Sequence, residues 1–179
     1  MAFRILFMGT PDFAVPILKS IHESKHRVIE VYTQSPKKKN RGQLILNTPV
    51  HECAKELEIS VRYPLSLTQE SEIEHVKNLK PDIVVVAAYG KILPNSLLDL
   101  KNILFINVHA SLLPMWRGAA PIQRAIMNMD SETGISIMKI EPKLDSGPVM
   151  LQSKIKIYPN LNFEELSNEM SKTGAELIL

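Results

Sequence analysis

The chain has 179 residues, of which 45% are hydrophobic and 22% are charged, so it has the length of one domain and enough apolar residues for a substantial core. Its formal net charge of +2 is too small to indicate nucleic-acid binding without a local cluster of charge. The single cysteine, Cys53, excludes an internal disulfide and a cysteine-rich metal site, and it fits a reduced cytoplasmic setting.

The first residues predict a buried strand at 3–8, followed by a turn and a helix. Their apolar run is too short for a signal peptide or a membrane span, so we expect a soluble cytoplasmic protein. Pro16 must lie in the first turn of the helix or kink it. A second β-prone run at 26–33 completes a strand–helix–strand unit of a parallel sheet. The turn contains only one glycine, Gly9, which argues against a dinucleotide site.

A basic segment interrupts the apolar pattern, and residues 34–47 are predicted as a loop. Four cations lie within six residues there, namely Lys37, Lys38, Lys39 and Arg41. Such a run is usually a solvated surface, but an exposed basic loop can also hold phosphate groups in a salt-sensitive manner. The residues themselves leave both interpretations open.

The next segments are predicted as helices at 48–58 and 69–79 and as strands at 60–63 and 83–87. Thr48 and Pro49 are typical of the start of a helix, whose apolar face includes Cys53. The last of these strands is entirely apolar, as in a strand buried on both faces of a sheet. Tyr89 and Lys91, which follow it, read as ordinary loop residues.

Polar residues occupy the end of the next predicted strand, at 103–109. Side chains alternate along a strand, so Asn107 and His109 face the same side, roughly 6 to 7 Å apart at ~3.3 Å per residue. Ligands of open α/β sheets bind outside the carboxyl ends of strands, so the loops after 83–87 and 103–109 should border one pocket. A lone Asn or His at such a place is, however, more often a hydrogen-bonded structural residue.

Asp145 lies further along, within the turn-forming residues 143–148. A strand, loop and strand can bring its carboxylate back to His109. Taken alone, Asp145 is equally well explained as a residue that shapes its own turn.

The remaining segments are predicted as helices at 118–128 and 162–179 and as strands at 133–140 and 149–158, the latter antiparallel at the margin of the sheet. Asn162 can cap the last helix, which we expect to run to the end of the chain. The complete pattern predicts an α/β protein with an open, mostly parallel twisted sheet and helices on both faces, as in Rossmann-like folds.

Several of these segments occur together in one known family. Residues 107–109, 111–114 and 144–147 resemble the corresponding motifs of the formyltransferases that use 10-formyltetrahydrofolate. The longer runs at 7–14 and 109–126 are similar to the methionyl-tRNA formyltransferases within that family. The resemblance covers nearly the whole chain, with the motifs in the same order.

The resemblance implies a Rossmann-like formyltransferase domain over residues 1–179. Such a domain transfers a formyl group from the co-substrate 10-formyltetrahydrofolate to the amino group of initiator methionyl-tRNA, for translation initiation, without a metal. By resemblance, the catalytic positions are Asn107, His109 and Asp145, and the folate site is Ser111, Leu112, Leu113 and Pro114. The family continues into a C-terminal β-barrel that helps to bind tRNA, and nothing in this sequence corresponds to it. We expect a monomer.

The same resemblance implies a role for the basic segment, because the corresponding loop of the family enters the acceptor stem of the tRNA. The residues concerned are Arg41, Lys37, Lys38 and Lys39. The tri-lysine is a departure from the usual loop. Two further departures are Met115, where a basic residue is common, and Lys143, where a glycine often tolerates a positive φ more readily.

The three catalytic positions suit formyl transfer, which passes through a tetrahedral intermediate with a negatively charged oxygen. Asn107 and His109 can donate hydrogen bonds to that oxygen, and Asp145 can favour the imidazolium form of His109 and order a water molecule that relays a proton.

Two alternatives remain. Formyltransferases that act on a glycinamide nucleotide or an amino sugar share these residues but usually lack the run at 116–121. A non-catalytic RNA-binding module is supported only by the basic segment.

Overall fold

The computed structural model describes residues 1–39 and 44–179, and its main element is a seven-stranded sheet. The elements in chain order are β1 (Arg4–Gly9), the 3-10 helix η1 (Asp12–Ala14), α1 (Val15–Glu23), β2 (Arg27–Tyr32), β3 (Lys37–Lys39), β4 (Leu44–Leu46), α2 (Pro49–Glu56), β5 (Val61–Arg62), α3 (Glu70–Leu79), β6 (Ile83–Ala87), α4 (Asn95–Leu98), β7 (Leu104–His109), α5 (Pro121–Met127), β8 (Glu132–Lys139), β9 (Val149–Lys156) and α6 (Phe163–Leu177). The strand order in the sheet is β5-β2-β1-β6-β7-β8-β9. The strands from β5 to β7 are parallel, whereas β8 and β9 are antiparallel to their neighbours. The predicted mostly parallel α/β fold is therefore confirmed.

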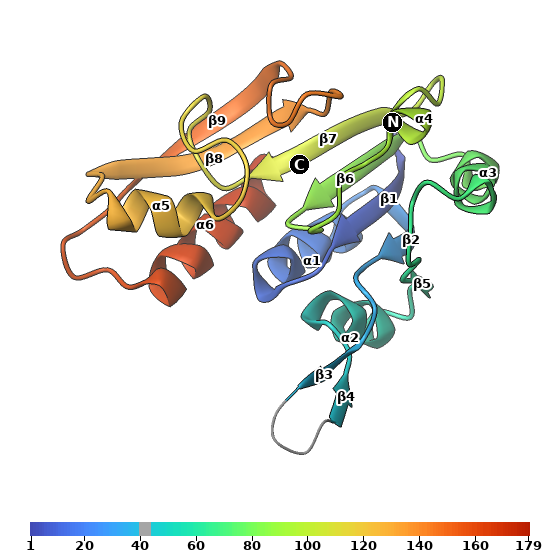
Figure 1. Cartoon of the computed structure of the whole chain (residues 1–179), viewed down its shortest axis with the longest axis horizontal. Helices are drawn as coiled ribbons and strands as arrows, with labels where there is room; N and C mark the ends of the chain where they lie inside the picture. The colour runs from blue at the N-terminus through green and yellow to red at the C-terminus, as the bar shows by residue number, and fades with distance from the viewer. Residues whose placement is uncertain (40–43) are drawn as a thin grey trace.

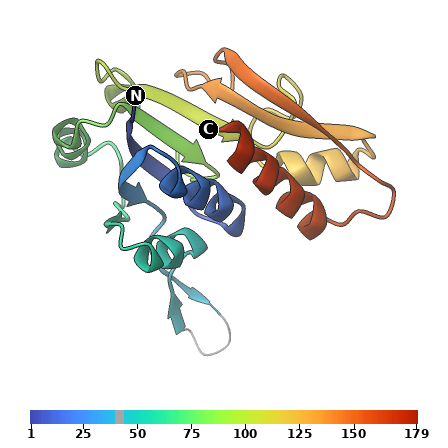
Figure 2. The same ribbon diagram turned by 180° about the vertical axis from the view of Figure 1, so that it is seen from behind.

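Helices cover both faces of this sheet (Figures 1 and 2). On one face, α1, α2, α5 and α6 pack against side chains such as Phe7 of β1, Val85 of β6 and Val108 of β7. Figure 2 shows α1 and α6 lying side by side over this face, and they share many contacts. On the other face, α3 and α4 pack over a second cluster that includes Leu6 of β1 and Phe105 of β7.

The residues that predicted the starts of helices form the expected contacts in the structure. The hydroxyl of Thr48 accepts a hydrogen bond from the backbone N–H of His51, at 3.1 Å, at the start of α2. Asn162 and Glu165 form a reciprocal capping box at the start of α6. Pro16 lies in the first turn of α1, where its missing N–H removes no helical hydrogen bond.

Three predicted helix boundaries were wrong by two or more residues. Helix α2 ends at Glu56 rather than at residue 58. Helix α5 begins at Pro121 rather than at residue 118, because Gly118 and Ala120 have left-handed φ angles of 85° and 56°. Helix α6 ends at Leu177 instead of continuing to residue 179.

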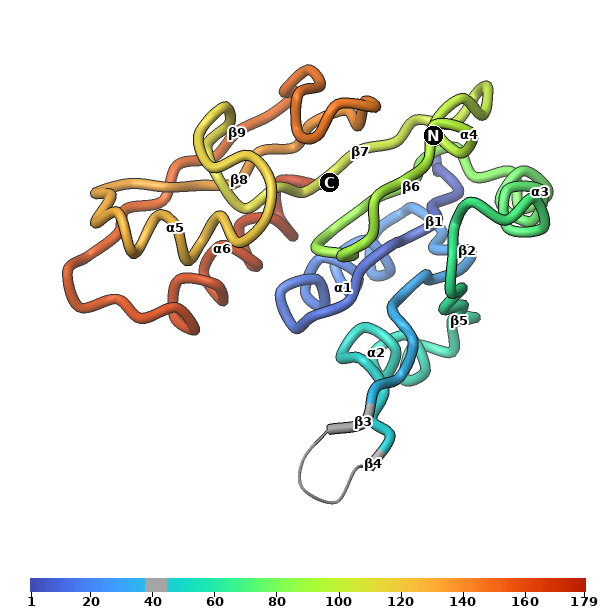
Figure 3. Tube along the Cα trace, in the orientation of Figure 1, coloured from blue at the N-terminus to red at the C-terminus, as the bar shows by residue number. Residues whose placement is uncertain are grey.

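The predicted loop at 34–47 contains an unexpected hairpin. Strand β3 is antiparallel to β4, with Lys37 opposite Leu46 and Lys39 opposite Leu44. Figures 1 and 3 show this hairpin projecting from the body of the molecule beside α2. Strand pairing uses backbone groups, so it can form without the apolar alternation that is missing here. Residue 41, which carries the predicted tRNA-contacting arginine, lies outside the described residues.

Within the described residues, no helix is long and apolar enough to span a lipid bilayer.

Candidate active site

Strand β7 separates two kinds of side chain. Ile106 and Val108 belong to the core cluster that faces α1 and α6. Because side chains alternate, Asn107 and His109 point to the opposite face, as the sequence predicted. There His109 meets two loops, since it contacts Trp116 from the chain after β7 and Asp145 from the connection between β8 and β9.

His109 is buried, and each of its two ring nitrogens faces an oxygen atom. Its Nε2 lies 3.0 Å from the backbone carbonyl oxygen of Trp116. A carbonyl can only accept a hydrogen bond, so Nε2 carries the proton when the ring is neutral. The other nitrogen, Nδ1, lies 3.7 Å from Oδ2 of Asp145, which is too long for a direct hydrogen bond but close enough for attraction once the ring is charged. Nδ1 is therefore the nitrogen that can exchange a proton.

Asp145 is held in place by the backbone. The N–H of Gly118 donates a hydrogen bond of 2.7 Å to Oδ2 of Asp145, the same oxygen that faces His109. Asp145 itself has a left-handed φ of 44°, whereas Lys143 does not have a positive φ. The positive φ in this connection therefore falls at Asp145, two residues after the position where the family often has a glycine. The structure brings His109 and Asp145 together as predicted.

Gly147 explains how this connection can fold back. A Cβ at this position would lie 2.0 Å from the carbonyl oxygen of Lys139. Only glycine allows the connection to approach β8 so closely, and the approach places Asp145 over the sheet.

The side chain of Asn107 is half-buried and accessible. Within residues 1–39 and 44–179, its amide makes no hydrogen bond, although its backbone pairs with the strands on either side. The strand places this side chain, and its amide has no partner among the described residues, so it is available to donate a hydrogen bond to a ligand. Asn107, His109 and Asp145 together offer one available hydrogen-bond donor and one pair that can exchange a proton.

The loop of residues 111–116 is supported from β8 and β9. The hydroxyl of Ser136 donates to the carbonyl of Ser111 at 2.6 Å and accepts from the N–H of Leu113 at 3.0 Å. The amide of Gln152 donates to the carbonyl of Leu113, also at 3.0 Å. The hydroxyl of Ser111 bonds to the carbonyl of Met115. Sequence reasoning missed Ser136 and Gln152, because nothing in their local pattern distinguishes them from other strand residues.

The predicted folate residues differ in exposure. Ser111 and Leu113 are buried, and the hydroxyl of Ser111 is already used within the loop. Leu112 is half-buried and Pro114 is exposed. A ligand at this loop would therefore meet the side chains of Leu112 and Pro114, whereas Ser111 and Leu113 would shape the loop from inside.

The loop after β6 is more structured than predicted. Tyr89 is buried, and its carbonyl accepts hydrogen bonds from Thr10 at 2.8 Å and from Gln34 at 3.1 Å. Burial raises the pKa of the Tyr89 phenol to about 12, with a smaller contribution from the charge of Glu72. The ammonium of Lys91 donates to backbone carbonyls, including that of Leu65 at 3.0 Å. Reading Tyr89 and Lys91 as ordinary loop residues was therefore wrong.

The basic segment is only partly described. The ammonium of Lys37 donates to the side chain of Gln34 at 2.9 Å, and Gln34 in turn bonds to the loop after β6. The backbones of Lys38 and Lys39 lie in β3, and Arg41 lies outside the described residues. Lys37 thus connects the base of the hairpin to a loop at the carboxyl edge of the sheet.

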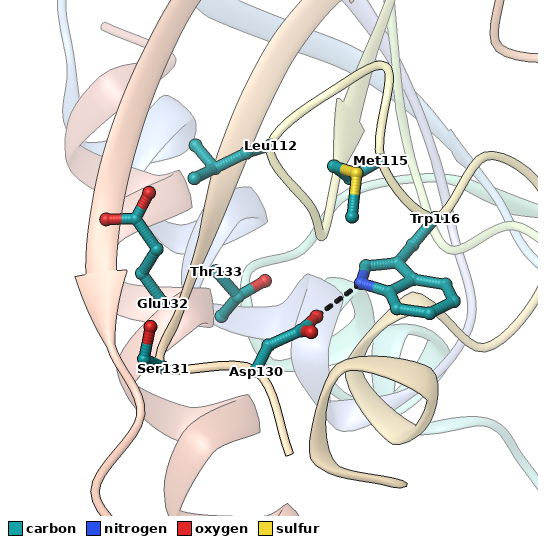
Figure 4. Close-up of a pocket in the computed structure, with 7 residues that line it drawn as sticks. All are labelled: Leu112, Met115, Trp116, Asp130, Ser131, Glu132 and Thr133. Carbon is teal, nitrogen blue, oxygen red and sulfur yellow. Dashed lines mark hydrogen bonds between the residues drawn. The ribbon is translucent and has the colours of Figure 1, made fainter. Parts of the chain in front are cut away.

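A cavity of about 220 Å³ lies behind the loop of residues 111–116 (Figure 4). Its walls are Leu112, Met115, Trp116, Asp130, Ser131, Glu132 and Thr133. The three predicted catalytic residues are not among them. Across this cavity, the indole N–H of Trp116 donates a hydrogen bond of 2.7 Å to Oδ2 of Asp130.

No group of three or more His, Cys, Asp or Glu side chains is arranged to hold a metal ion in the described part of the chain.

Comparison with known proteins shows clear relatives. The chain is 52% identical over 180 residues to a methionyl-tRNA formyltransferase of Pelagibacter ubique, 49% identical over 176 residues to one of Wolbachia from Drosophila simulans, and 47% identical over 179 residues to one of Coxiella burnetii. These matches cover 98 to 100% of this chain but only 57 to 59% of each relative. The chain thus spans less than two thirds of the length of these relatives.

Solved structures show the same fold. A phosphoribosylglycinamide formyltransferase from Bacillus halodurans superimposes with a TM-score of 0.80 at 23% identity, covering 97% of this chain and 90% of that one. A glycinamide ribonucleotide transformylase from Geobacillus kaustophilus gives a TM-score of 0.78 at 23% identity, covering 99% of this chain and 95% of that one. The family model described as formyl transferase matches residues 3–179. The chain therefore belongs to the formyl transferase family.

Proposed function

We propose that this chain transfers a formyl group from 10-formyltetrahydrofolate to the amino group of methionine on initiator methionyl-tRNA, as a cytoplasmic step of translation initiation. Residues 1–179 form the catalytic domain in this proposal and act as a monomer. The observation that carries it is the approach of Asp145 to within 3.7 Å of His109, on the face of β7 that Asn107 shares with His109. Relatives named methionyl-tRNA formyltransferase, 47 to 52% identical, support the choice of substrate.

Asn107 has the properties that formyl transfer requires of an oxyanion donor. The amine nitrogen bonds to the formyl carbon, and the carbonyl oxygen becomes negatively charged. The accessible amide of Asn107 then donates a hydrogen bond to that oxygen, an interaction that typically changes rates by about 10² to 10³. The bond between the formyl carbon and the folate nitrogen breaks as the carbonyl reforms.

His109 and Asp145 handle the proton that the attacking amine must lose. With Nε2–H held by the carbonyl of Trp116, the lone pair on Nδ1 of His109 accepts this proton. The resulting imidazolium faces Oδ2 of Asp145 at 3.7 Å, which stabilises its charge. The same proton can return to the folate nitrogen as it leaves, so the transfer is balanced.

Two further surfaces complete the proposal. The loop from Ser111 to Pro114 holds the folate co-substrate: Leu112 and Pro114 contact it, and the buried Ser111 and Leu113 fix the shape of the loop. The basic segment of Lys37, Lys38, Lys39 and Arg41, of which the three lysines lie in β3, contacts the tRNA phosphates. A hairpin that projects from the body can reach an elongated partner without disturbing the core (Figure 1).

Glycinamide nucleotides and amino sugars are the second candidate acceptors. The solved structures with this fold favour the first of them, since several are named phosphoribosylglycinamide formyltransferase. Their identity to this chain is below 25%, compared with about 50% for the methionyl-tRNA enzymes. A purely RNA-binding role leaves the arrangement of His109 and Asp145 without a purpose.

The test is a formyl-transfer assay with the purified chain and 10-formyltetrahydrofolate. Methionyl-tRNA, a glycinamide nucleotide and an amino sugar are compared as acceptors, with a His109→Ala variant as the blank. We expect His109-dependent formylation of methionyl-tRNA. Preferential formylation of either small amine would overturn the assigned acceptor, and tRNA binding without transfer would favour the RNA-binding module.

A further inference from the structure

Trp116 lies between the cavity of Figure 4 and the candidate active site and contacts both through different groups. Its backbone carbonyl accepts the hydrogen bond from Nε2 of His109, at 3.0 Å. Its indole N–H donates to Oδ2 of Asp130 on the other side of the loop, at 2.7 Å (Figure 4). One residue thus joins the buried imidazole to a carboxylate just before β8.

The backbone of Trp116 is held in an unfavourable conformation. Its φ of 54° is left-handed, a region that a residue with a large side chain rarely adopts. Such conformations persist only where surrounding contacts determine them. Here the preceding carbonyl, that of Met115, is bonded by the hydroxyl of Ser111, and the N–H of Gly118 is bonded by Asp145. The indole bond to Asp130 is a further contact that holds Trp116, beside the bond of 3.0 Å from the N–H of Met115 to the carbonyl of Leu112.

Asp130 is well suited to hold this indole. Its second oxygen, Oδ1, accepts a hydrogen bond of 2.7 Å from the side chain of Asn128, so both oxygens are oriented. The backbone N–H of Asp130 bonds to the carbonyl of Ala125 in α5, at 3.0 Å. A hydrogen bond to a charged carboxylate is stronger than one between neutral groups. Asp130 is therefore fixed in position and can hold the indole of Trp116.

We propose that Trp116 and Asp130 are positioning residues that keep the neutral ring of His109 in its Nε2–H tautomer. The bond between indole and carboxylate holds the left-handed backbone, which aims the Trp116 carbonyl at Nε2. The carbonyl oxygen accepts a hydrogen bond from Nε2–H but would repel the lone pair of an unprotonated Nε2. The lone pair of the neutral ring is therefore on Nδ1, the nitrogen that faces Asp145. The part of this inference that concerns turnover rests on the proposed formyl transfer.

The tautomer is measured directly by long-range ¹H–¹⁵N NMR of the histidine rings in the purified chain. A His109→Gln variant identifies the His109 signals among the five histidines. In the unsubstituted chain we expect His109 to be protonated at Nε2 over the pH range in which the ring is neutral. Protonation at Nδ1 instead would overturn the proposal without any further variant.

Two variants remove the anchor from opposite ends. Trp116→Phe keeps an aromatic ring but lacks the N–H, and Asp130→Leu lacks both acceptor oxygens. Each should convert His109 to a mixture of tautomers. If they act through one bond, the double variant should show no further change. Glu132→Gln is the matched control, because Glu132 lines the same cavity but bonds to Lys154 instead of Trp116.

Turnover gives a second and separable measurement. We expect each anchor variant to lower kcat about tenfold or more, with an altered pH profile and little change in KM for the folate, because general acid–base catalysis is typically worth about 10² to 10⁴. An unchanged tautomer and pH profile in a folded Trp116→Phe or Asp130→Leu chain would overturn the proposal. A shifted tautomer in a chain without formyl-transfer activity would support the positioning role and reject the proposed function instead.

Discussion

At the scale of single residues, His109 shows how a strand and two loops give the two nitrogens of one ring different surroundings. The strand fixes the direction of the ring, the carbonyl of Trp116 occupies Nε2, and Asp145 faces Nδ1. Each of the three contacts comes from a different segment. Which ring nitrogen is left without a hydrogen bond is therefore a property of the folded chain and not of the residue type.

Replacing His109 by Ala should lower kcat by about 10² to 10⁴, because the ring acts on the transition state, while folate binding stays nearly unchanged. Asp145→Asn should also lower kcat and change its pH profile, since it removes the charge opposite Nδ1. Steady-state kinetics between pH 6 and 9 and a folate titration measure both effects. Glu141→Gln, in the exposed part of the same connection, is the matched control. Turnover of the His109 variant at the parental rate would contradict the assignment.

Tyr89 and Tyr32 are a natural pair for testing buried hydroxyl groups. Both are buried, but the hydroxyl of Tyr32 donates to Glu72 at 3.1 Å, whereas that of Tyr89 has no partner within the described residues. Tyr89→Phe should therefore leave the free energy of unfolding unchanged or raise it by up to about 1 kcal/mol. Tyr32→Phe should lower it by about 1 to 2 kcal/mol, because it leaves Glu72 with one donor fewer. Urea unfolding at pH 7 followed by circular dichroism measures both.

The raised pKa of Tyr89 makes the stability difference between the parent and Tyr89→Phe depend on pH. Because the pKa is 10.0 for an ordinary tyrosine and about 12 in the folded chain, ionisation favours the unfolded chain at alkaline pH. The contribution of Tyr89 to stability is complete below pH 10 and is lost as the pH rises towards 12. Tyr89→Phe should therefore unfold less readily than the parent above pH 10. Equal stability losses in the two chains between pH 10 and 12 would contradict this.

At the scale of elements, the β3–β4 hairpin differs most from its prediction. A run of lysines with no apolar alternation was read as a loop, yet its backbone pairs with residues 44–46. The exposed apolar side chains of Ile45 and Leu46 lie on this projecting element rather than in the core. A projecting element with exposed side chains can meet a partner, as the proposed tRNA contact requires.

The charge of the hairpin leads to a salt-dependence prediction. Each phosphate contact contributes about 0.7 to 0.9 to the slope of log affinity against log salt concentration. Replacing Lys37, Lys38, Lys39 and Arg41 by Ser should therefore flatten the slope for tRNA binding by up to about 3 and weaken the affinity, with folate binding unchanged. Titration of tRNA at several salt concentrations measures this, with Lys172→Ser on α6 as the control. Parental slope and affinity in the quadruple variant would show that the segment is only a solvated surface.

At the scale of the whole molecule, one polar cluster joins α3 to the edge of the sheet. Glu72 of α3 accepts hydrogen bonds from Tyr32 of β2 and from Arg62 of β5. Nearby, His75 of α3 lies 2.8 Å from Glu30 of β2. Burial opposes the ionisation of Glu72, but the hydrogen bonds from Arg62 and Tyr32 outweigh it and hold the pKa of its carboxyl below the ordinary value.

This balance predicts how the protein responds to acid. A lowered pKa means that ionised Glu72 stabilises the fold above about pH 4.5 and that this contribution is lost as the pH falls through the folded value. Arg62→Met should reduce stability at pH 7, because Glu72 then keeps its charge with fewer partners. The difference from the parent should shrink as the pH falls through the lowered pKa of Glu72, where its carboxyl becomes protonated.

Urea unfolding between pH 7 and pH 3 measures this difference. Lys154→Met is the control, because its ion pair with Glu132 is exposed and should contribute less than about 1 kcal/mol. A difference between parent and Arg62→Met that does not change with pH would contradict the role of Glu72.

The sequence by itself determined the elements and much of the fold. Thr48 and Asn162 start helices, residues 83–87 form a buried strand, and Asn107 and His109 share one face of β7. These features depend on periodicity and on hydrogen bonds between residues at most a few positions apart, so a local pattern is sufficient to predict them.

Only the tertiary structure decided how the site is assembled. The placement of Asp145 over His109 depends on the close approach of Gly147 to β8, and the choice of Nδ1 depends on a carbonyl held by Trp116 and Asp130. The burial of Tyr89 and the pairing of β3 with β4 likewise arise from neighbours that no periodicity records. These contacts join residues that lie far apart in the sequence and are connected by loops. The path of a loop depends on the surfaces against which it packs, so a local pattern does not predict it. Local sequence therefore specified the strands and helices, whereas packing selected the reactive atoms.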